Sequence, residues 1–235
     1  PDLPDTNRLG LLRTRADLRS SMGDVAGTVE DLEAAFPLDP GSVLEALSDA
    51  LEKQRQGAQD RGDAQVERAS TLRLSELSLN SQDRDMARAL LTGWIERERK
   101  DVDALRMLRD VDKADGQWEA VAKTSARLVA IETGEPQVQA ALSLFEACST
   151  MGSPGDARAG LEHARRKQPE NRDIRDALLE IYEAIGADGE LAKLLQEAAQ
   201  EVEDPAVRLP MLKRVAQLFV SEGETEAAMP VIQAV

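Results

Sequence analysis

The sequence predicts an all-α protein built from repeated pairs of antiparallel helices. Only 3% of its 235 residues are aromatic, whereas the strong helix formers Ala, Leu, Glu and Arg recur throughout. A sheet core would draw instead on β-branched and aromatic residues. A turn followed by an amphipathic segment also returns along the chain. The turn glycines Gly116, Gly152, Gly186 and Gly223 lie 36, 34 and 37 residues apart, a spacing typical of a helix-turn-helix repeat.

The first repeat illustrates why each element is expected where it is. Residues 1–6 are predicted to be a linker, and residues 7–21 and 24–36 are predicted to be the first two helices. Between them Gly23 lets the chain turn, and Asp24 can cap the second helix. Pro37 and Pro40 are expected to end that helix, because proline cannot continue it.

The remaining helices follow the same logic of turn residues and amphipathic spacing. They are predicted near residues 42–58, 64–80, 83–98, 101–114, 117–131, 136–150, 154–167, 171–185, 188–202, 205–221 and 224–235. The stretch from Ser42 to Gln82 fits the period worst, since its helices are long and the turn "DRGD" interrupts the spacing. Without a Pro-rich or Ser/Gly-rich linker, residues 7–235 are expected to form one domain of about six repeats.

In two of the units, the turn glycine, the closing proline and the inward-facing residues lie at the same spacing. Gly23 to Pro40 spans the same number of residues as Gly152 to Pro169. Their inward-facing positions also correspond and are small or apolar: Thr28, Leu32 and Ala35 in the first unit, and Ala157, Leu161 and Ala164 in the second. Small residues let paired helices approach closely, and stacked neighbours then bury the surface that one pair leaves open.

These units resemble the tetratricopeptide repeat, whose second helix carries an Ala and whose unit closes on a Pro. The segments "GDVAGTVEDLEAAFPLDP" and "GSPGDARAGLEHARRKQP" keep this half, and Leu178 and Tyr182 match the first-helix half. The resemblance covers most of the chain. It implies a right-handed α-solenoid of antiparallel helix pairs, in which the first helices line a concave groove.

Composition restricts the classes of partner and excludes several kinds of site. The chain has 44 acidic and 29 basic residues and a net charge of -15, which disfavours nucleic acids and anionic membranes. No apolar run reaches the roughly 20 residues of a membrane-spanning helix. One cysteine and one histidine cannot form a disulfide framework or a Cys/His zinc site. We therefore expect no cofactor, no metal and no enzymatic activity. The location stays unknown, with the cytoplasm favoured, because the chain begins without an initiator Met and its native N-terminus is expected to be missing.

The acidic helix faces are the predicted partner-binding surface. In "RDIRDALLEIYEAIG" a buried stripe is expected at helical spacing, formed by Ile174, Leu178, Ile181 and Ile185. An acidic stripe lies on the same helix, formed by Asp173, Asp176, Glu180 and Glu183. The resemblance implies that these acids face the groove. Neighbouring units would add Asp103, Asp110 and Glu146, with Arg106 and Lys113 interleaved.

The predicted function is therefore a protein-interaction scaffold that binds a basic or amphipathic peptide along an acidic groove. The competing interpretation of the acids is a solvated face of an acidic protein. Two other functions stay open. One is a regulatory or docking segment of a larger enzyme, and the other is a structural spacer or self-assembly module. The chain is expected to stop inside a longer array, so its last helix, with Ile232 and Val235 on one side, could pair with another copy.

The single cysteine, the single histidine and the two tryptophans are predicted to have structural roles. Cys148 lies on an apolar face and is expected to be buried and inert, and His163 is expected to be exposed in a polar stripe. Neither has the partner that an activated nucleophile needs. Trp118 is predicted to pack between helices. Trp94 is assigned to a helix face that contacts the next unit, with a ligand contact as the alternative.

Overall fold

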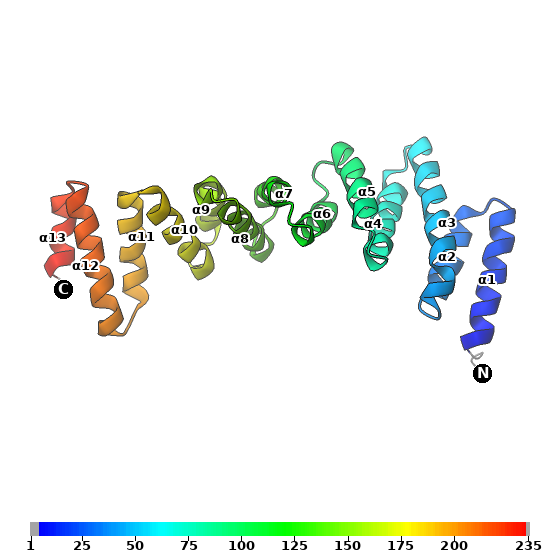
Figure 1. The fold of residues 1–235 in the computed structure, drawn as a ribbon, viewed down its shortest axis with the longest axis horizontal. Helices are drawn as coiled ribbons and strands as arrows, with labels where there is room; N and C mark the ends of the chain where they lie inside the picture. The colour runs from blue at the N-terminus through cyan, green and yellow to red at the C-terminus, as the bar shows by residue number, and fades with distance from the viewer. Residues whose placement is uncertain (1–4, 234–235) are drawn as a thin grey trace. The chain divides into compact units, whose positions relative to one another are not determined.

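The fold was obtained as a computed structural model that describes residues 5–233. The chain divides into two compact units, which we call unit 1 (residues 1–111) and unit 2 (residues 112–235). Every regular element among the described residues is helical, with thirteen α-helices and one short 3₁₀ helix (Figure 1). The prediction of an all-α helical-repeat architecture is confirmed.

The helix bounds agree with the predicted ranges to within about three residues at most ends. Unit 1 holds α1 (Asp5–Ser21), α2 (Val25–Ala35), α3 (Pro40–Arg61), α4 (Ala64–Asn80), α5 (Arg84–Arg97) and most of α6 (Val102–Ala114). Unit 2 holds α7 (Trp118–Ile131), α8 (Glu135–Thr150), η1 (Pro154–Ala157), α9 (Arg158–Lys167), α10 (Arg172–Ile185), α11 (Asp188–Glu201), α12 (Pro205–Ser221) and α13 (Thr225–Gln233).

Several helices begin just after a residue whose side chain caps them. Asp24, as predicted, accepts a hydrogen bond at 2.9 Å from the Gly27 N–H at the start of α2. This satisfies one of the backbone donors that the first turn of a helix leaves unpaired. The same arrangement starts five further helices, with the caps Asp39, Asp63, Asp83, Asn171 and Asp204. Short polar residues before the amphipathic runs therefore determine where these helices begin.

Tight turns with a left-handed residue join the members of each pair. Glycine occupies this position at 23, 62, 116, 152, 186 and 223. A further turn joins α4 to α5 and places Gln82 at φ 63°, where a side chain is disfavoured. Three helices, α3, α4 and α5, are thus connected by two successive tight turns. This extra helix and turn explain why the stretch from Ser42 to Gln82 does not fit the repeat spacing.

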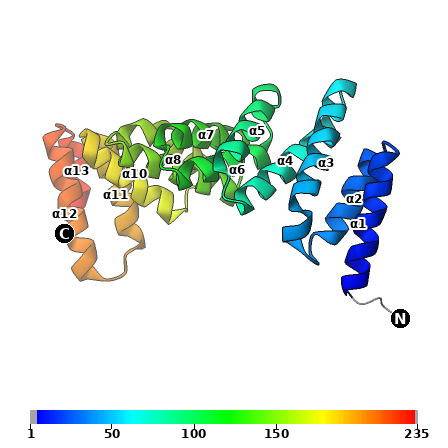
Figure 2. The same cartoon turned by 45° about the vertical axis from the view of Figure 1, so that its right-hand side comes forward.

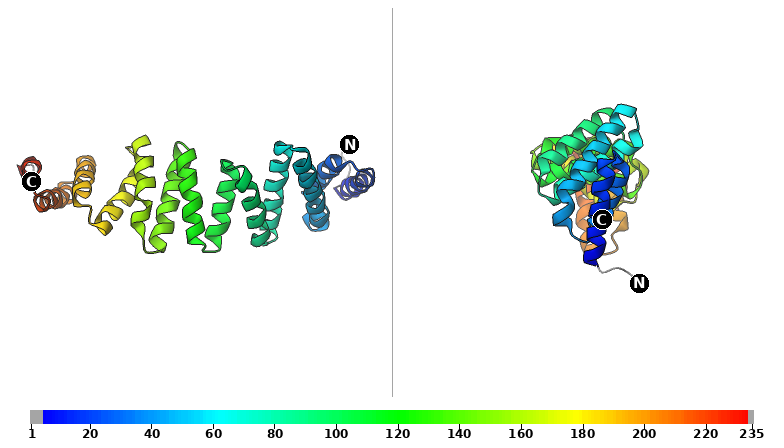
Figure 3. Two further views of the ribbon diagram at one scale, coloured as in Figure 1. Left: turned by 90° about the horizontal axis from the view of Figure 1, so that it is seen from above. Right: turned by 90° about the vertical axis from the view of Figure 1, so that its right-hand side faces the viewer.

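Each unit buries its small and aliphatic residues between neighbouring helices. In unit 1, α1 lies beside α2 and α2 beside α3 (Figure 2), and the predicted inward residues Thr28, Leu32 and Ala35 are buried. In unit 2, the green to yellow helices α7 to α10 stand side by side (Figure 3). Their matching positions Ala157, Leu161 and Ala164 are fully buried. Both sets of offsets are confirmed.

Several predicted details need correction. Helix α1 begins at Asp5, inside the predicted linker, and residues 1–4 lie outside the described part of the chain. Pro40 begins α3 instead of merely ending α2, because proline has no N–H to lose at the first helical position. Ile185, expected in the buried stripe, is 44% exposed, because it is the last residue of α10, where the helix gives way to the Gly186 turn.

Candidate interaction surfaces

The acidic stripe of α10 is where the sequence predicted it. The stripe consists of Asp173, Asp176, Glu180 and Glu183, all exposed, and the opposite face buries Ile174, Leu178 and Ile181. Asp173 and Glu180 have no ion pair among the described residues. Asp176 and Glu183 have only distant cations, at 3.9 Å from an Arg175 and an Arg214 nitrogen respectively. The negative charge of this face is therefore largely uncompensated.

The other predicted groove residues are mostly engaged in ion pairs. In unit 2, Glu146 of α8 is exposed and pairs with Lys113, and α8 packs against α10. In unit 1, Asp103 binds Arg68 at 2.6 Å and lies 3.9 Å from Arg106. The adjacent Asp110 pairs with Arg109 at 2.8 Å. These pairs reduce the charge that Asp103, Asp110 and Glu146 offer to a ligand, so the α10 stripe is the most acidic part of the predicted set.

A groove that the sequence did not reveal lies over α4, between α3 and α5. It consists of two cavities, of about 290 and 580 Å³, which share the lining residues Arg55, Met86 and Leu90. We call their union the α4 groove. One end of it is mainly apolar and is lined by Leu44, Leu74, Leu77, Met86 and Leu90, together with the acidic residues Asp49, Glu52 and Asp83.

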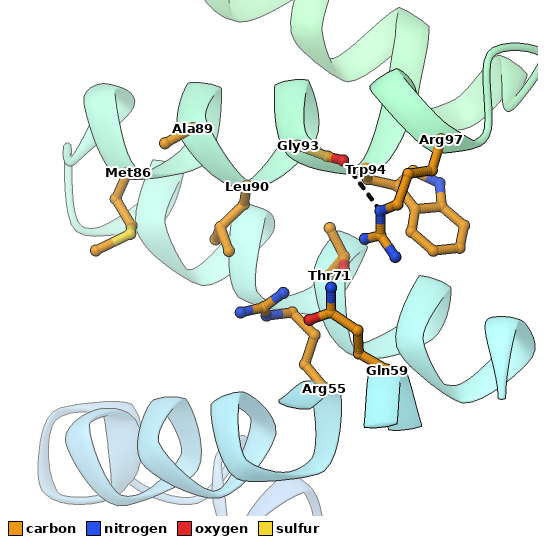
Figure 4. Close-up of a pocket in the computed structure, with 9 residues that line it drawn as sticks. All are labelled: Arg55, Gln59, Thr71, Met86, Ala89, Leu90, Gly93, Trp94 and Arg97. Atoms are coloured by element: carbon orange, nitrogen blue, oxygen red, sulfur yellow. Dashed lines mark hydrogen bonds between the residues drawn. The ribbon is translucent and has the colours of Figure 1, made fainter. Parts of the chain in front are cut away.

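The other end of the α4 groove is polar, and Figure 4 shows Arg55 and Arg97 reaching into it from opposite walls. Arg55 donates from Nε and Nη2 to Glu52, at 2.8 and 2.6 Å, which leaves its Nη1 without a partner among the described residues. Arg97 binds the buried carboxylate of Glu67 through both terminal nitrogens. These hydrogen bonds hold the pKa of both guanidinium groups above its usual value.

Trp94 lies at the same end of the groove. Its side chain is 3% exposed, and its Nε1 donates at 2.7 Å to Asp101, which follows α5 in the chain. Asp101 also accepts from Arg68 at 2.6 Å and from the Ala104 N–H at 3.2 Å. Trp94 is thus a core residue of unit 1 that fixes the corner between α5 and α6.

A second polar cluster lies in unit 2 between α9 and α10. The Tyr182 hydroxyl donates at 3.0 Å to Glu162, which also binds Arg158 at 2.7 Å. The Arg158 guanidinium lies over the tyrosine ring, 5.2 Å from its centre. Burial, together with the neighbouring Glu162 carboxylate, raises the pKa of Tyr182 to about 12. The phenol therefore stays protonated and serves the packing of α9 on α10.

The cysteine prediction is confirmed and the histidine prediction is wrong. Cys148 is buried, and burial raises the pKa of its thiol, as expected for an inert residue. His163 is half-buried, because α9 is short and packs against both α8 and α10. Among residues 5–233, no cluster of three or more His, Cys, Asp or Glu side chains could hold a metal ion.

The last two helices carry an apolar surface. Val220, Met229 and Ile232 are each more than half exposed. Val220 and Ile232 line a shallow depression of about 530 Å³ together with Lys213, Ala216, Gln217 and Ser221. Val235, which was predicted to share this face, lies outside the described residues. No helix in the described part of the chain is long and apolar enough to cross a membrane.

Comparison with known proteins yields structural neighbours only. No protein-family model matches the sequence, and no curated protein matches it. The MamA protein is 14% identical over 94% of this chain and 97% of its own, with a TM-score of 0.42. A tetratricopeptide repeat protein from Parabacteroides merdae is 12% identical over 97% and 98% of the two chains, with a TM-score of 0.35. A thermophilic TPR protein of Thermus thermophilus is 15% identical over 92% and 100%, with a TM-score of 0.34.

At such low identities these likenesses say nothing of function, and the architecture rests on the chain's own helix pairs and left-handed turns. The chain is an all-α helical-repeat protein. Sequence patterns indicated the α10 stripe but not the α4 groove. One signal was available for the groove: Gly93 interrupts the interior of α5, where glycine weakens a helix.

Proposed function

We propose that this protein is an interaction scaffold that binds a basic or amphipathic peptide segment of a partner protein. The observation that carries the proposal is the exposed and largely unpaired acidic stripe of α10. Carboxylates spaced three, four and three residues apart along one helix face present a row of negative charge. A basic segment lying along that row would gain several weak contacts at once.

The test is the binding of a lysine-rich peptide, measured by fluorescence anisotropy at low and at physiological salt. Reversing two stripe charges with Asp176→Lys and Glu180→Lys should weaken binding by about tenfold at low salt. Adding salt should weaken the wild-type interaction and shrink the difference, because exposed charges are screened. A peptide with glutamine in place of lysine should bind much less well.

A matched control changes the net charge equally with two substitutions in unit 1 instead of the stripe. Glu45 on α3 and Glu96 on α5 are exposed and unpaired among the described residues, so Glu45→Lys with Glu96→Lys should leave most of the binding intact. Equal losses in both double variants would mean that only overall acidity attracts the peptide. The α10 stripe would then be a solvated face.

A second candidate function, self-association through α12 and α13, is favoured by the exposed Val220, Met229 and Ile232. Apolar side chains grouped on one face often mark a protein interface. Sedimentation velocity over a range of concentrations tests it, with Ile232→Lys as the variant that should shift the distribution toward monomer. A wild-type protein that stays monomeric at high concentration would rule this candidate out.

A further inference from the structure

We propose that the α4 groove of unit 1 binds an amphipathic α-helix of another protein, with apolar side chains at one end and a carboxylate at the other. This second site is separate from the α10 stripe. It lies in the segment where three helices replace the regular pair, and it selects a partner of different chemistry.

The shape of the groove favours a helix. Because α3 and α5 both run opposite to α4, they form parallel walls on its two sides. The lining residues of α3 extend from Leu44 to Gln59, which spans roughly 22 Å, or about four helical turns. All three walls are helices whose backbone groups are already hydrogen-bonded, so they cannot pair with an extended strand. A bound helix satisfies its own backbone groups.

The groove face of α5 allows close approach at its centre. Met86, Leu90, Gly93 and Arg97 follow at spacings of four, three and four residues and share this face. A Cβ added at Gly93 would meet no atom within 4 Å, so no packing within the chain requires glycine there. A glycine that weakens the helix interior and faces an open groove leaves room for another backbone.

The polar end of the groove offers hydrogen-bond donors to a carboxylate, whereas Asp49, Glu52 and Asp83 line the rest of the groove. At the polar end, the free Nη1 of Arg55 and the side chain of the exposed Gln59 are available as donors, while the nearby Arg97 guanidinium is already bound to Glu67. At the opposite end, the half-buried Leu44 and Leu90 and the exposed Met86 offer apolar contacts. A guanidinium binds a carboxylate more strongly than it binds a neutral acceptor, so the carboxylate fixes the direction in which the helix lies.

The experiment uses the whole chain and three labelled helical peptides of about four turns. Each carries leucines at helical spacing. The first has a glutamate near its C-terminus, the second has glutamine at that position, and the third has the same composition as the first in scrambled order. Fluorescence anisotropy reports binding. The emission of Trp94, in a Trp118→Phe background, reports whether the peptide occupies the groove. The glutamate peptide should bind about tenfold more tightly than the glutamine peptide, and the scrambled peptide should bind weakest.

Gly93→Leu is the decisive variant, because a Cβ at this position meets no atom within 4 Å, the leucine side chain would occupy the groove, and leucine replaces a poor helix former. It should abolish peptide binding while the thermal midpoint stays the same or rises. Gly10→Leu on α1 is the matched control, since a Cβ there also meets nothing within 4 Å. It should bind like the wild type. Arg55→Gln should remove the preference for glutamate over glutamine.

Other results would overturn the proposal. The groove is not the site if Gly93→Leu binds the glutamate peptide as well as Gly10→Leu does, or if all three peptides bind equally or not at all. A wild-type dimer that Gly93→Leu dissociates would assign the groove to a second copy of this chain. Because the lysine-rich peptide tests α10 separately, either site can fail while the other stands.

Discussion

Tyr182 shows how one side chain can be used for packing where its chemistry suggests reactivity. It is the only tyrosine of the chain and is buried, with its hydroxyl on Glu162 and its ring beneath Arg158. Both burial and the nearby carboxylate disfavour the tyrosinate, so the folded state prefers the neutral phenol. The ordinary pKa of tyrosine, near 10, applies to the unfolded chain.

We therefore expect Tyr182 to ionise near pH 12 in the folded protein and near pH 10 in denaturant. Its contribution to stability is complete below about pH 10 and is lost as the pH rises toward 12, because the unfolded chain then ionises first. Absorbance at the tyrosinate band measures this directly, since no other tyrosine contributes. A midpoint near 10 in the native protein would contradict the buried hydrogen bond.

Gln82 carries backbone strain that its counterparts avoid. It adopts φ 63° in the turn between α4 and α5, whereas glycine occupies the corresponding position in six other turns. Gln82→Gly should raise the free energy of unfolding by about 0.5–1 kcal/mol, despite the added freedom of the unfolded chain. The opposite change, Gly116→Ala, should lower it by a similar amount. Urea unfolding, monitored by circular dichroism, measures both changes. If the two variants changed the free energy of unfolding in the same direction, Gln82 would not be strained.

At the scale of elements, Asp101 holds the corner between α5 and α6. Its carboxylate is 5% exposed and binds Arg68, the Trp94 indole and the Ala104 N–H. Burial alone would raise the pKa of Asp101, but the hydrogen bonds from Arg68, Trp94 and Ala104 outweigh it and hold the pKa below its ordinary value. The charged form is therefore the one that stabilises the corner.

Asp101→Asn should lower the free energy of unfolding at pH 7 by about 2 kcal/mol, because it removes the charge of a buried carboxylate that binds Arg68. Asp103→Asn removes an exposed partner of the same Arg68 and should cost less than about 0.5 kcal/mol. Because the pKa of Asp101 is lower in the folded protein than in the unfolded chain, its charge stabilises the fold fully only above the ordinary aspartate pKa of about 4. The loss of stability caused by Asp101→Asn should therefore shrink as the pH falls below about 4. Urea titrations at pH 7 and pH 3 test this, and a deficit that stays constant with pH would exclude the ionic mechanism.

At the scale of the whole molecule, the two units provide separate optical reporters. Trp94 lies in unit 1, and Tyr182 lies in unit 2. In a helical-repeat protein each helix contacts mainly its neighbours, so stability is distributed locally. We expect Trp94 fluorescence, measured in the Trp118→Phe variant, and Tyr182 absorbance to report different urea midpoints. Coincident transitions by both probes would show that the two units unfold as one.

The positions of the helices were determined by the sequence itself. Asp24, Asp63 and Asp83 cap their helices by bonding N–H groups three residues ahead, and the turns depend on single left-handed residues. The acidic stripe of α10 is equally local, because residues three and four apart share a helix face in any context. Helix caps, turns and helix faces depend on residues close together in the sequence, so they could be predicted from it. The all-α repeat of the described residues was predicted from these local features.

Only the tertiary structure decided which helix faces meet. Arg68 lies 33 residues from Asp101, and the walls of the α4 groove come from three helices, so no local spacing indicates either contact. The burial of His163 was mispredicted for the same reason, since burial depends on which neighbour covers a face. Helical periodicity shows which side chains point the same way along one helix. The packing of distant segments determines whether that side is core, solvent or binding surface.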